Sequence, residues 1–116
     1  MKDCIFCRIS RKEIAADIVY EDNFILAFRD ARPIAPVHVL VIPKKHIESI
    51  ADISEKDEKL MGRMILAAKK IASELKISEY GYKLLFRVGQ HGGQEVGHIH
   101  LHLIGGARLK EVIEPI

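Results

Sequence analysis

Hydrophobic and polar residues follow two different periods along the 116-residue chain. Short runs rich in β-branched and aromatic side chains are typical of strands, and Asp22-Asn23 separates the first two as a hairpin turn would. The third run is almost continuously apolar and follows a segment whose two prolines exclude regular pairing. Five strands are predicted, at 17–21, 24–28, 37–42, 82–88 and 98–104.

A helical period occupies the middle of the chain. Ser54 and Asp57 have the spacing of a capping box, and apolar residues then recur every three or four positions as far as Leu75. This pattern predicts one long helix at about 54–76. Because the strands cluster around one helix and do not alternate with helices, we expect an α+β fold with an antiparallel sheet.

Composition and charge narrow the class of protein. The length and the lack of a linker-like stretch favour one domain spanning 1–116, and 48% hydrophobic residues suffice for one core. A net charge of +2 gives little electrostatic reason to bind a nucleic-acid backbone. No apolar run has the length of a signal-peptide core or a membrane span. We therefore expect a soluble cytoplasmic protein that binds neither nucleic acid nor membrane.

The strongest chemical signal is a row of histidines in the last predicted strand. His98, His100 and His102 alternate with aliphatic residues, so the period of two places all three imidazoles on one face. Each imidazole can serve as nucleophile, general acid or base, or metal ligand, or can be a satisfied core histidine. The loop 91–97 has three glycines, whose backbone N–H groups can approach a phosphate. Together, loop and histidines favour phosphoryl chemistry, with metal binding by all three histidines as the main alternative.

The stretch from Gly92 to Gly106, with its His-x-His-x-His pattern, resembles the histidine triad (HIT) family and in particular its Hint branch. Residues 26–46 and 4–9 are also similar to Hint proteins, so the resemblance spans nearly the whole chain. It implies a HIT-like fold with a short N-terminal helix. It also implies a purine nucleoside phosphoramidase-like hydrolase or nucleotidyl transferase, whose substrate is a purine nucleotide such as an AMP derivative.

The resemblance assigns a role to each histidine of the site. His100 would be the nucleophile that forms a nucleotidyl-histidine intermediate, oriented by the main-chain carbonyl of His98. His102 would hydrogen-bond the phosphate oxygens, and His38 would complete the polar network. No catalytic cofactor would be needed.

The resemblance also implies a nucleotide-binding set. Asp30 would bind the ribose hydroxyls. Arg87 stands where the family usually has asparagine, and it either clamps a phosphate or points away from the nucleotide. The remaining expected contacts are Ile5, Phe6, Phe28, Ala31 and Leu40 around the base, which equally suit an ordinary core, and Gly93, Gln94, Glu95 and Val96 in the loop.

Two cysteines near the start of the chain indicate a candidate metal site. Cys4 and Cys7 have a common metal-binding spacing, and a closed zinc site needs two more ligands. The resemblance implies that these are His46 and His98, with zinc as a structural ion. The alternative is a pair of reduced cysteines without metal.

Assembly and activity leave alternatives open. The predicted helix carries more apolar surface, including Met61 and Ile65, than a small sheet covers, which predicts a homodimer.

Two alternative activities remain. A dinucleoside polyphosphate hydrolase is disfavoured by the short segment after Gly106, which offers few residues for a second nucleoside. A zinc-stabilised nucleotide-binding or protein-interaction module with incidental catalysis is the alternative from another class.

Overall fold

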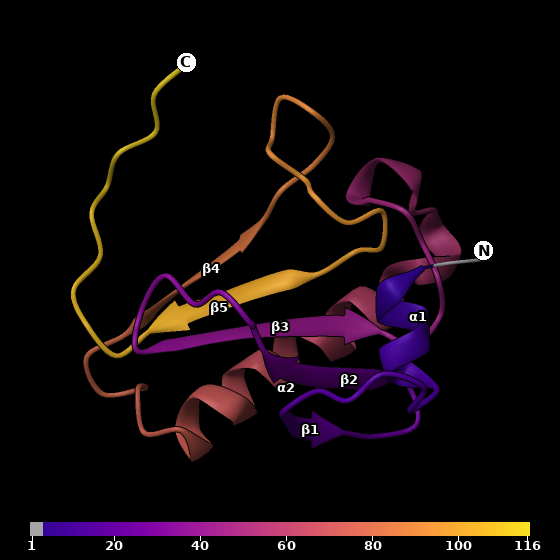
Figure 1. Cartoon of the computed structure of the whole chain (residues 1–116), viewed down its shortest axis with the longest axis horizontal. Helices are drawn as coiled ribbons and strands as arrows, with labels where there is room; N and C mark the ends of the chain where they lie inside the picture. The colour runs from indigo at the N-terminus through magenta and orange to yellow at the C-terminus, as the bar shows by residue number, and fades with distance from the viewer. Residues whose placement is uncertain (1–3) are drawn as a thin grey trace.

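The computed structural model describes residues 4–116 as an α+β fold built on one five-stranded antiparallel sheet, which confirms the predicted fold class. Helix α1 (Ile5–Ser10) lies on one face of the sheet and helix α2 (Glu58–Glu74) on the other (Figure 1). Short 3-10 turns at Ile50–Asp52 and Glu55–Asp57 precede α2. The strands are β1 (Ile18–Glu21), β2 (Ile25–Arg29), β3 (Val37–Pro43), β4 (Tyr82–Phe86) and β5 (Leu101–Gly105), in the order β1-β2-β3-β5-β4.

Alternate residues of the central strands supply a separate hydrophobic cluster on each face of the sheet. On the α2 face, Val39 and Leu103 pack with Met64 and Ile71, and small alanines let the helix approach closely. On the α1 face, the smaller cluster consists of Phe6, Ile9, Leu26, Phe28, Leu40 and Ile42. The strand period of two thus gives one face to the main core and leaves the other to α1 and the histidines.

Two element boundaries differ by three or more residues from those predicted. Helix α2 begins at Glu58 and not at Ser54, because the Ser54 capping box closes a 3-10 turn before the helix. Strand β5 begins at Leu101 and not at His98, because Ile99 N–H donates to the carbonyl of Ile47 outside the strand ladder. His98 and His100 therefore lie in the segment that leads into β5, and only His102 lies in the strand itself.

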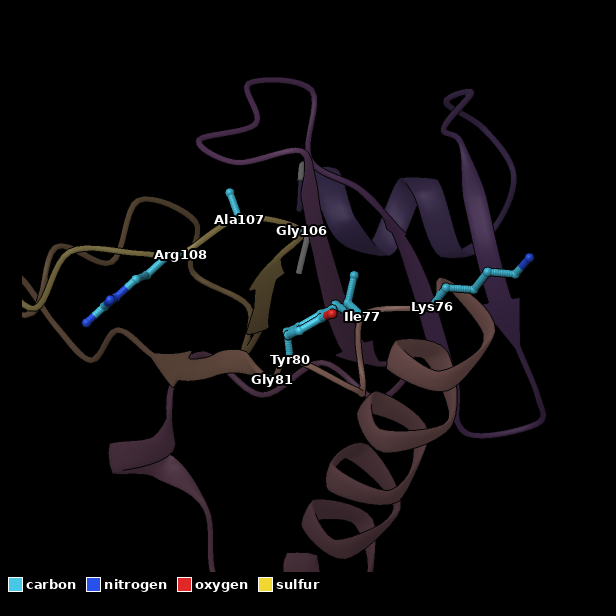
Figure 2. Close-up of a pocket in the computed structure, with 7 residues that line it drawn as sticks. All are labelled: Lys76, Ile77, Tyr80, Gly81, Gly106, Ala107 and Arg108. Carbon is cyan, nitrogen blue, oxygen red and sulfur yellow. The ribbon is translucent and has the colours of Figure 1, made fainter.

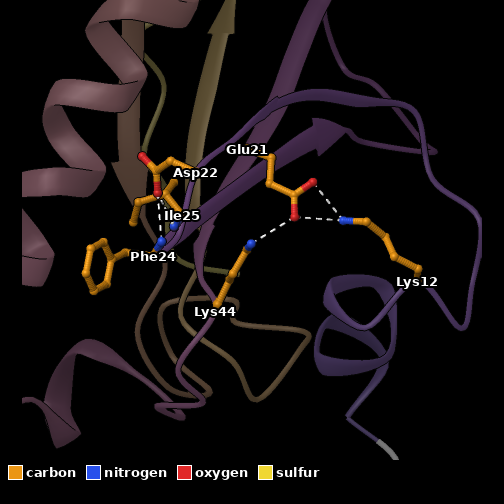
Figure 3. Close-up of polar contacts among 6 residues, drawn as sticks. All are labelled: Lys12, Glu21, Asp22, Phe24, Ile25 and Lys44. Carbon is orange, nitrogen blue, oxygen red and sulfur yellow. Dashed lines mark hydrogen bonds and ion pairs between the residues drawn. The ribbon is translucent and has the colours of Figure 1, made fainter.

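Polar contacts close the first hairpin and join it to the segment after α1. Asp22 Oδ1 accepts the N–H groups of Phe24 and Ile25 at 2.8 Å, and Glu21 lies 2.8 Å from both Lys12 and Lys44 (Figure 3). These ion pairs are exposed, so their contribution to stability is small. No helix within residues 4–116 is both long and apolar enough to cross a membrane.

Candidate active site

A cavity of about 870 Å³ opens on the α1 face of the sheet, and His100 and His102 form part of its wall. Its apolar walls come from α1, β2 and β3, while the charged residues Asp17, Arg29 and Arg32 also line it. The cavity includes ten of the expected site residues: Ile5, Phe6, Phe28, Asp30, Ala31, Leu40, Glu95, Val96, His100 and His102.

Aromatic rings connect the apolar part of the cavity to the histidines. The Phe6 ring on α1 makes edge-to-face contacts with Phe28 and His100, with centroid distances of 5.3 Å and 5.2 Å. It also meets the ring of His98 edge-on at 5.9 Å, so both imidazoles contact the same side of α1. Apolar walls beside a few convergent polar groups suit a flat aromatic ligand with a polar end, such as a purine nucleotide.

His100 is held by a single strong main-chain contact. Its Nδ1 lies 2.7 Å from the carbonyl oxygen of His98, and the residue is buried. A carbonyl oxygen only accepts hydrogen bonds, so Nδ1 carries the proton and donates it. The other ring nitrogen, Nε2, therefore keeps its lone pair in a residue that lines the cavity.

A chain of hydrogen bonds fixes the opposite arrangement in His102. Ile34 N–H donates to His38 Nδ1 at 3.2 Å, so the proton of neutral His38 is on Nε2. His38 Nε2 lies 3.0 Å from His102 Nδ1 and donates to it, which places the His102 proton on Nε2. That nitrogen is buried and has no hydrogen-bond partner among residues 4–116. A buried N–H donor beside the cavity is suited to an anionic oxygen of a ligand.

Burial keeps the imidazoles of His102 and His38 uncharged. It lowers the pKa of His102 to about 4; repulsion from Arg87 and from the protonated forms of His100 and His38 adds to the effect, and the Asp30 carboxylate opposes it. Burial also lowers the pKa of His38, although the Asp30 carboxylate opposes the change. Both rings are therefore neutral at pH 7, as their hydrogen bonds require.

Asp30 lies at the edge of this network. Its Oδ1 accepts the main-chain N–H of Arg32 at 2.8 Å, and its Oδ2 lies 3.4 Å from His38 Nε2. Each carboxylate oxygen retains acceptor capacity for a ligand hydroxyl. The placement is compatible with the ribose contact expected from the sequence.

The glycine-rich loop is built differently from the sequence prediction. Gly93 N–H donates to the carbonyl of Gln90 and Gln94 N–H to that of Gly89, so neither amide is available to a phosphate. The Gln94 side chain donates to the carbonyls of Glu48 and Val96 at 2.7 and 2.9 Å. Gly93 and Gln94 thus shape the loop and do not line the cavity, and their contact with a nucleotide stays a prediction.

Arg87 follows β4 directly and also does not line the cavity. Its side chain lies beside the loop, because a Cβ built on Gly93 would be 3.8 Å from Arg87 Cδ and Nη1. The residue is exposed, and it forms no ion pair within residues 4–116.

The two cysteines meet two histidines at the N-terminal end of α1. His98 Nδ1 lies 3.3 Å from Cys4 Sγ, 3.6 Å from Cys7 Sγ and 3.2 Å from His46 Nδ1. Cys7 Sγ is also 3.4 Å from His46 Nδ1, and one ligand atom from each residue lies within 4.8 Å of all the others. This Cys2His2 cluster could hold zinc.

The donor set fits zinc in both geometry and protonation. Tetrahedral zinc, with bonds of about 2.0 Å to nitrogen and about 2.3 Å to sulfur, places its ligand atoms roughly 3.3–3.8 Å apart, close to the spacings observed. His98 Nε2 donates to the carbonyl of Pro43 at 2.8 Å, which leaves the Nδ1 lone pair directed at the cysteines. Burial lowers the pKa of His98 to about 4, so this lone pair is free at neutral pH.

The Cys7 thiol needs a nearby cation to ionise at neutral pH. Burial raises the pKa of the Cys7 thiol to about 11, and the hydrogen bond and charge of Cys4 add to this. A divalent metal ion would stabilise the thiolate directly.

Several residues that line the cavity were missed by the sequence analysis. They are Ile9, Ile14, Ala15, Ala16, Asp17, Arg29 and Arg32. Residues 14–17 lie in an irregular segment without hydrophobic periodicity, so no pattern could have identified them. Arg29 and Arg32 flank Asp30, and their proximity to a predicted site residue was the one available signal.

A second cavity, of about 570 Å³, lies between the end of α2 and the end of β5. Figure 2 shows Tyr80 and Ile77 beside Gly106 in this region, while the Lys76 side chain points away. It contains none of the histidines, cysteines or carboxylates of the first site.

The amino-acid sequence is similar to that of known proteins along most of its length. The family model described as HIT domain matches residues 11–109. Purine nucleoside phosphoramidase of Escherichia coli (strain K12) is 49% identical over 108 residues, which are 93% of this chain and 91% of that protein. An uncharacterised HIT-like protein of Synechococcus elongatus is 47% identical, over 93% of this chain and 94% of its own.

Solved structures show the same similarity. A HIT family hydrolase from Legionella pneumophila is 51% identical with a TM-score of 0.92, over 94% of this chain and 97% of that structure. A histidine triad protein from Clostridium difficile is 41% identical with a TM-score of 0.94, over 97% and 98% of the two chains.

Proposed function

The chain belongs to the HIT domain family, and from this premise we propose that it hydrolyses purine nucleotide derivatives at the α-phosphorus, as a purine nucleoside phosphoramidase does. The single observation that carries the proposal is the hydrogen bond from His100 Nδ1 to the carbonyl of His98. It leaves an unprotonated Nε2 in the wall of a cavity whose other walls suit a purine nucleoside.

The proposed reaction has two halves. In the first, His100 Nε2 forms a bond to phosphorus while the bond from phosphorus to the amine breaks; the amine keeps the electron pair and takes a proton from water. In the second, water attacks phosphorus, the bond to His100 breaks, and the nucleoside monophosphate leaves. The proton that water loses in the second half balances the one taken in the first.

The surrounding residues would stabilise charge and position the nucleotide. His102 Nε2–H would donate to a phosphate oxygen, where negative charge is held throughout the reaction. Asp30 would accept from the ribose hydroxyls, and Phe6, Phe28 and Leu40 would contact the base and exclude water.

We propose a structural role for zinc at Cys4, Cys7, His46 and His98. A bound ion would supply no chemistry to the reaction and would link α1 to the segment before β5. Because α1 carries Phe6, this link would also hold one wall of the cavity in place.

We also propose a homodimer. Ile65 and Leu66 of α2 are 44% and 67% exposed, although the opposite side of the helix is buried against the sheet. An exposed apolar surface of this kind suits an isologous contact between two copies. A monomer mass in solution scattering at micromolar concentration would contradict the dimer.

The test of the activity compares the wild type with His100→Ala on adenosine 5′-phosphoramidate, with nucleotide binding measured for both proteins. We expect turnover by the wild type, loss of turnover in the variant and similar binding by the two. Tight binding without turnover by either protein would instead favour a nucleotide-binding module.

A further inference from the structure

The order of strands places Arg87 on the far side of His100 and His102 from the base cavity. Phe28 lies on β2, Leu40 on β3, His102 on β5 and Arg87 at the end of β4, and the sheet runs β2-β3-β5-β4. Suppose that the base of a nucleotide lies over β2 and β3 and that its phosphorus lies at His100. The group attached to the phosphorus on the side away from the base then lies near β4.

The register indicates that Arg87 shares the face of the sheet that carries the reactive histidines. Leu85 pairs with His102 and Phe86 with Leu101, and paired residues of antiparallel strands point to the same side. Phe86 packs with the α2 core, as Leu101 does. Arg87, one residue after Phe86, belongs to the opposite face together with His102.

The charge of Arg87 is not neutralised by the protein. The guanidinium forms no ion pair within residues 4–116. Burial is the largest cause of the lowered pKa values of His102 and His38. The Arg87 charge is close enough to these two rings to make a smaller contribution in the same direction. An uncompensated guanidinium with two edges for bidentate hydrogen bonds is suited to a carboxylate or phosphate.

We propose that Arg87 is a specificity-determining residue that selects substrates whose leaving group carries an oxyanion, either a carboxylate or a phosphate. The inference rests on the proposed function, because it concerns the group attached to the α-phosphorus in that reaction. Base and ribose occupy the cavity, the α-phosphorus lies at His100 and His102, and the leaving group extends over β4 to Arg87. The Arg87 side chain lies beside Gly93, since a Cβ built there would be in ordinary van der Waals contact with it.

A different role for Arg87 makes a different prediction. If its guanidinium bound the α-phosphate, it would assist every substrate equally, whatever the leaving group. The two roles are separated by substrates that differ only in the leaving group.

The experiment uses adenosine 5′-phosphoramidates of propylamine, β-alanine and phosphoethanolamine, which present a neutral, a carboxylate and a phosphate tail. We expect kcat/KM of the wild type to be about tenfold higher for the anionic tails than for propylamine, as expected for one charge-assisted contact. In Arg87→Gln this preference should fall to within about twofold, while hydrolysis of the propylamine substrate persists. Arg87→Lys should keep part of the preference.

Lys83→Gln is the matched control, because Lys83 is a cation on the same face of β4 but lies opposite Ile104, beyond the histidines. This variant should keep the wild-type preference. An unchanged preference in Arg87→Gln, equal losses on all three substrates, or no preference in the wild type would each overturn the inference.

Binding measurements keep this test separate from that of the proposed function. Sulfamoyl adenosines with the same three tails cannot be hydrolysed by this route, and their affinities report tail recognition alone. If the wild type hydrolyses none of the substrates, the proposed function fails. Preferential binding of anionic tails that depends on Arg87 would still support the inference, and equal binding of all tails would overturn it.

Discussion

His98 and His100 are two residues apart and both buried, yet they use opposite ring nitrogens for their main-chain hydrogen bonds. His98 donates from Nε2 to the carbonyl of Pro43, so its Nδ1 lone pair is directed at Cys4 and Cys7. His100 donates from Nδ1 to the carbonyl of His98, so its Nε2 lone pair is the free one. The difference teaches that the main-chain acceptor, and not the residue type, decides which nitrogen is reactive.

His98 connects the Cys2His2 cluster with His100, but it uses a different group for each contact. The side chain of His98 belongs to the Cys2His2 cluster, while its carbonyl accepts the hydrogen bond from His100. A change in the metal cluster should therefore affect stability more than chemistry, and a change in the catalytic network should do the reverse.

The largest expected effect on stability comes from breaking the Cys2His2 cluster with Cys7→Ser. We expect loss of bound zinc and a fall in the free energy of unfolding of about 4 kcal/mol when free zinc is a thousand times its Kd. Below the unfolding temperature, kcat should change little. Chelator-treated wild type is the control and should be as unstable as the variant. A zinc-to-protein ratio near zero in wild type never exposed to chelators would contradict the site.

The substitution His102→Ala, in the proposed catalytic network, should lower activity and leave the Cys2His2 cluster intact. Removing the Nε2–H donor should lower kcat by about 10²–10³-fold, the usual cost of one donor that stabilises transition-state charge. Zinc content should equal that of the wild type, as measured by metal analysis. Unchanged kcat would show that His102 does not donate to the reacting phosphate.

A smaller effect is expected on the pH dependence of the free energy of unfolding, through the buried imidazole of His102. The folded protein lowers the pKa of His102 from 6.5 to about 4, so between these values the unfolded chain binds a proton that the folded chain does not. Stability from this group is therefore complete above pH 6.5, declines as the pH falls towards 4, and is then constant. The decline should amount to about 3 kcal/mol. Urea unfolding of wild type and His102→Gln should give a shallower decline in the variant; parallel curves would contradict the assignment.

Periodic patterns in the sequence predicted the sheet and the placement of the histidines well. The alternation around His102 and the apolar run at 37–42 correspond to the strands that form the centre of the sheet. The boundaries at Ser54 and His98 were wrong because local hydrogen bonds, to a capping box and to Ile47, replace the regular ladder at these points.

Features without a period were not predictable in the same way. The loop glycines were expected to direct amides at a phosphate, but Gly93 N–H and Gln94 N–H close turns inside the loop. Gly92 instead allows the loop to pass close to the main chain of Val88, with which a Cβ at this position would collide. The tautomers of His38 and His102 depend on the N–H of Ile34, a contact that no side-chain pattern records.

The most direct test of the central claim is to locate the covalent intermediate. Wild type mixed with adenosine 5′-phosphoramidate and rapidly quenched should carry one nucleotidyl group, mapped by mass spectrometry to His100, which forms and decays as fast as turnover. The adduct should be absent from His100→Ala and slower to form in His102→Ala. An adduct on His98 or His102, or full turnover by His100→Ala, would contradict the division of roles between these histidines.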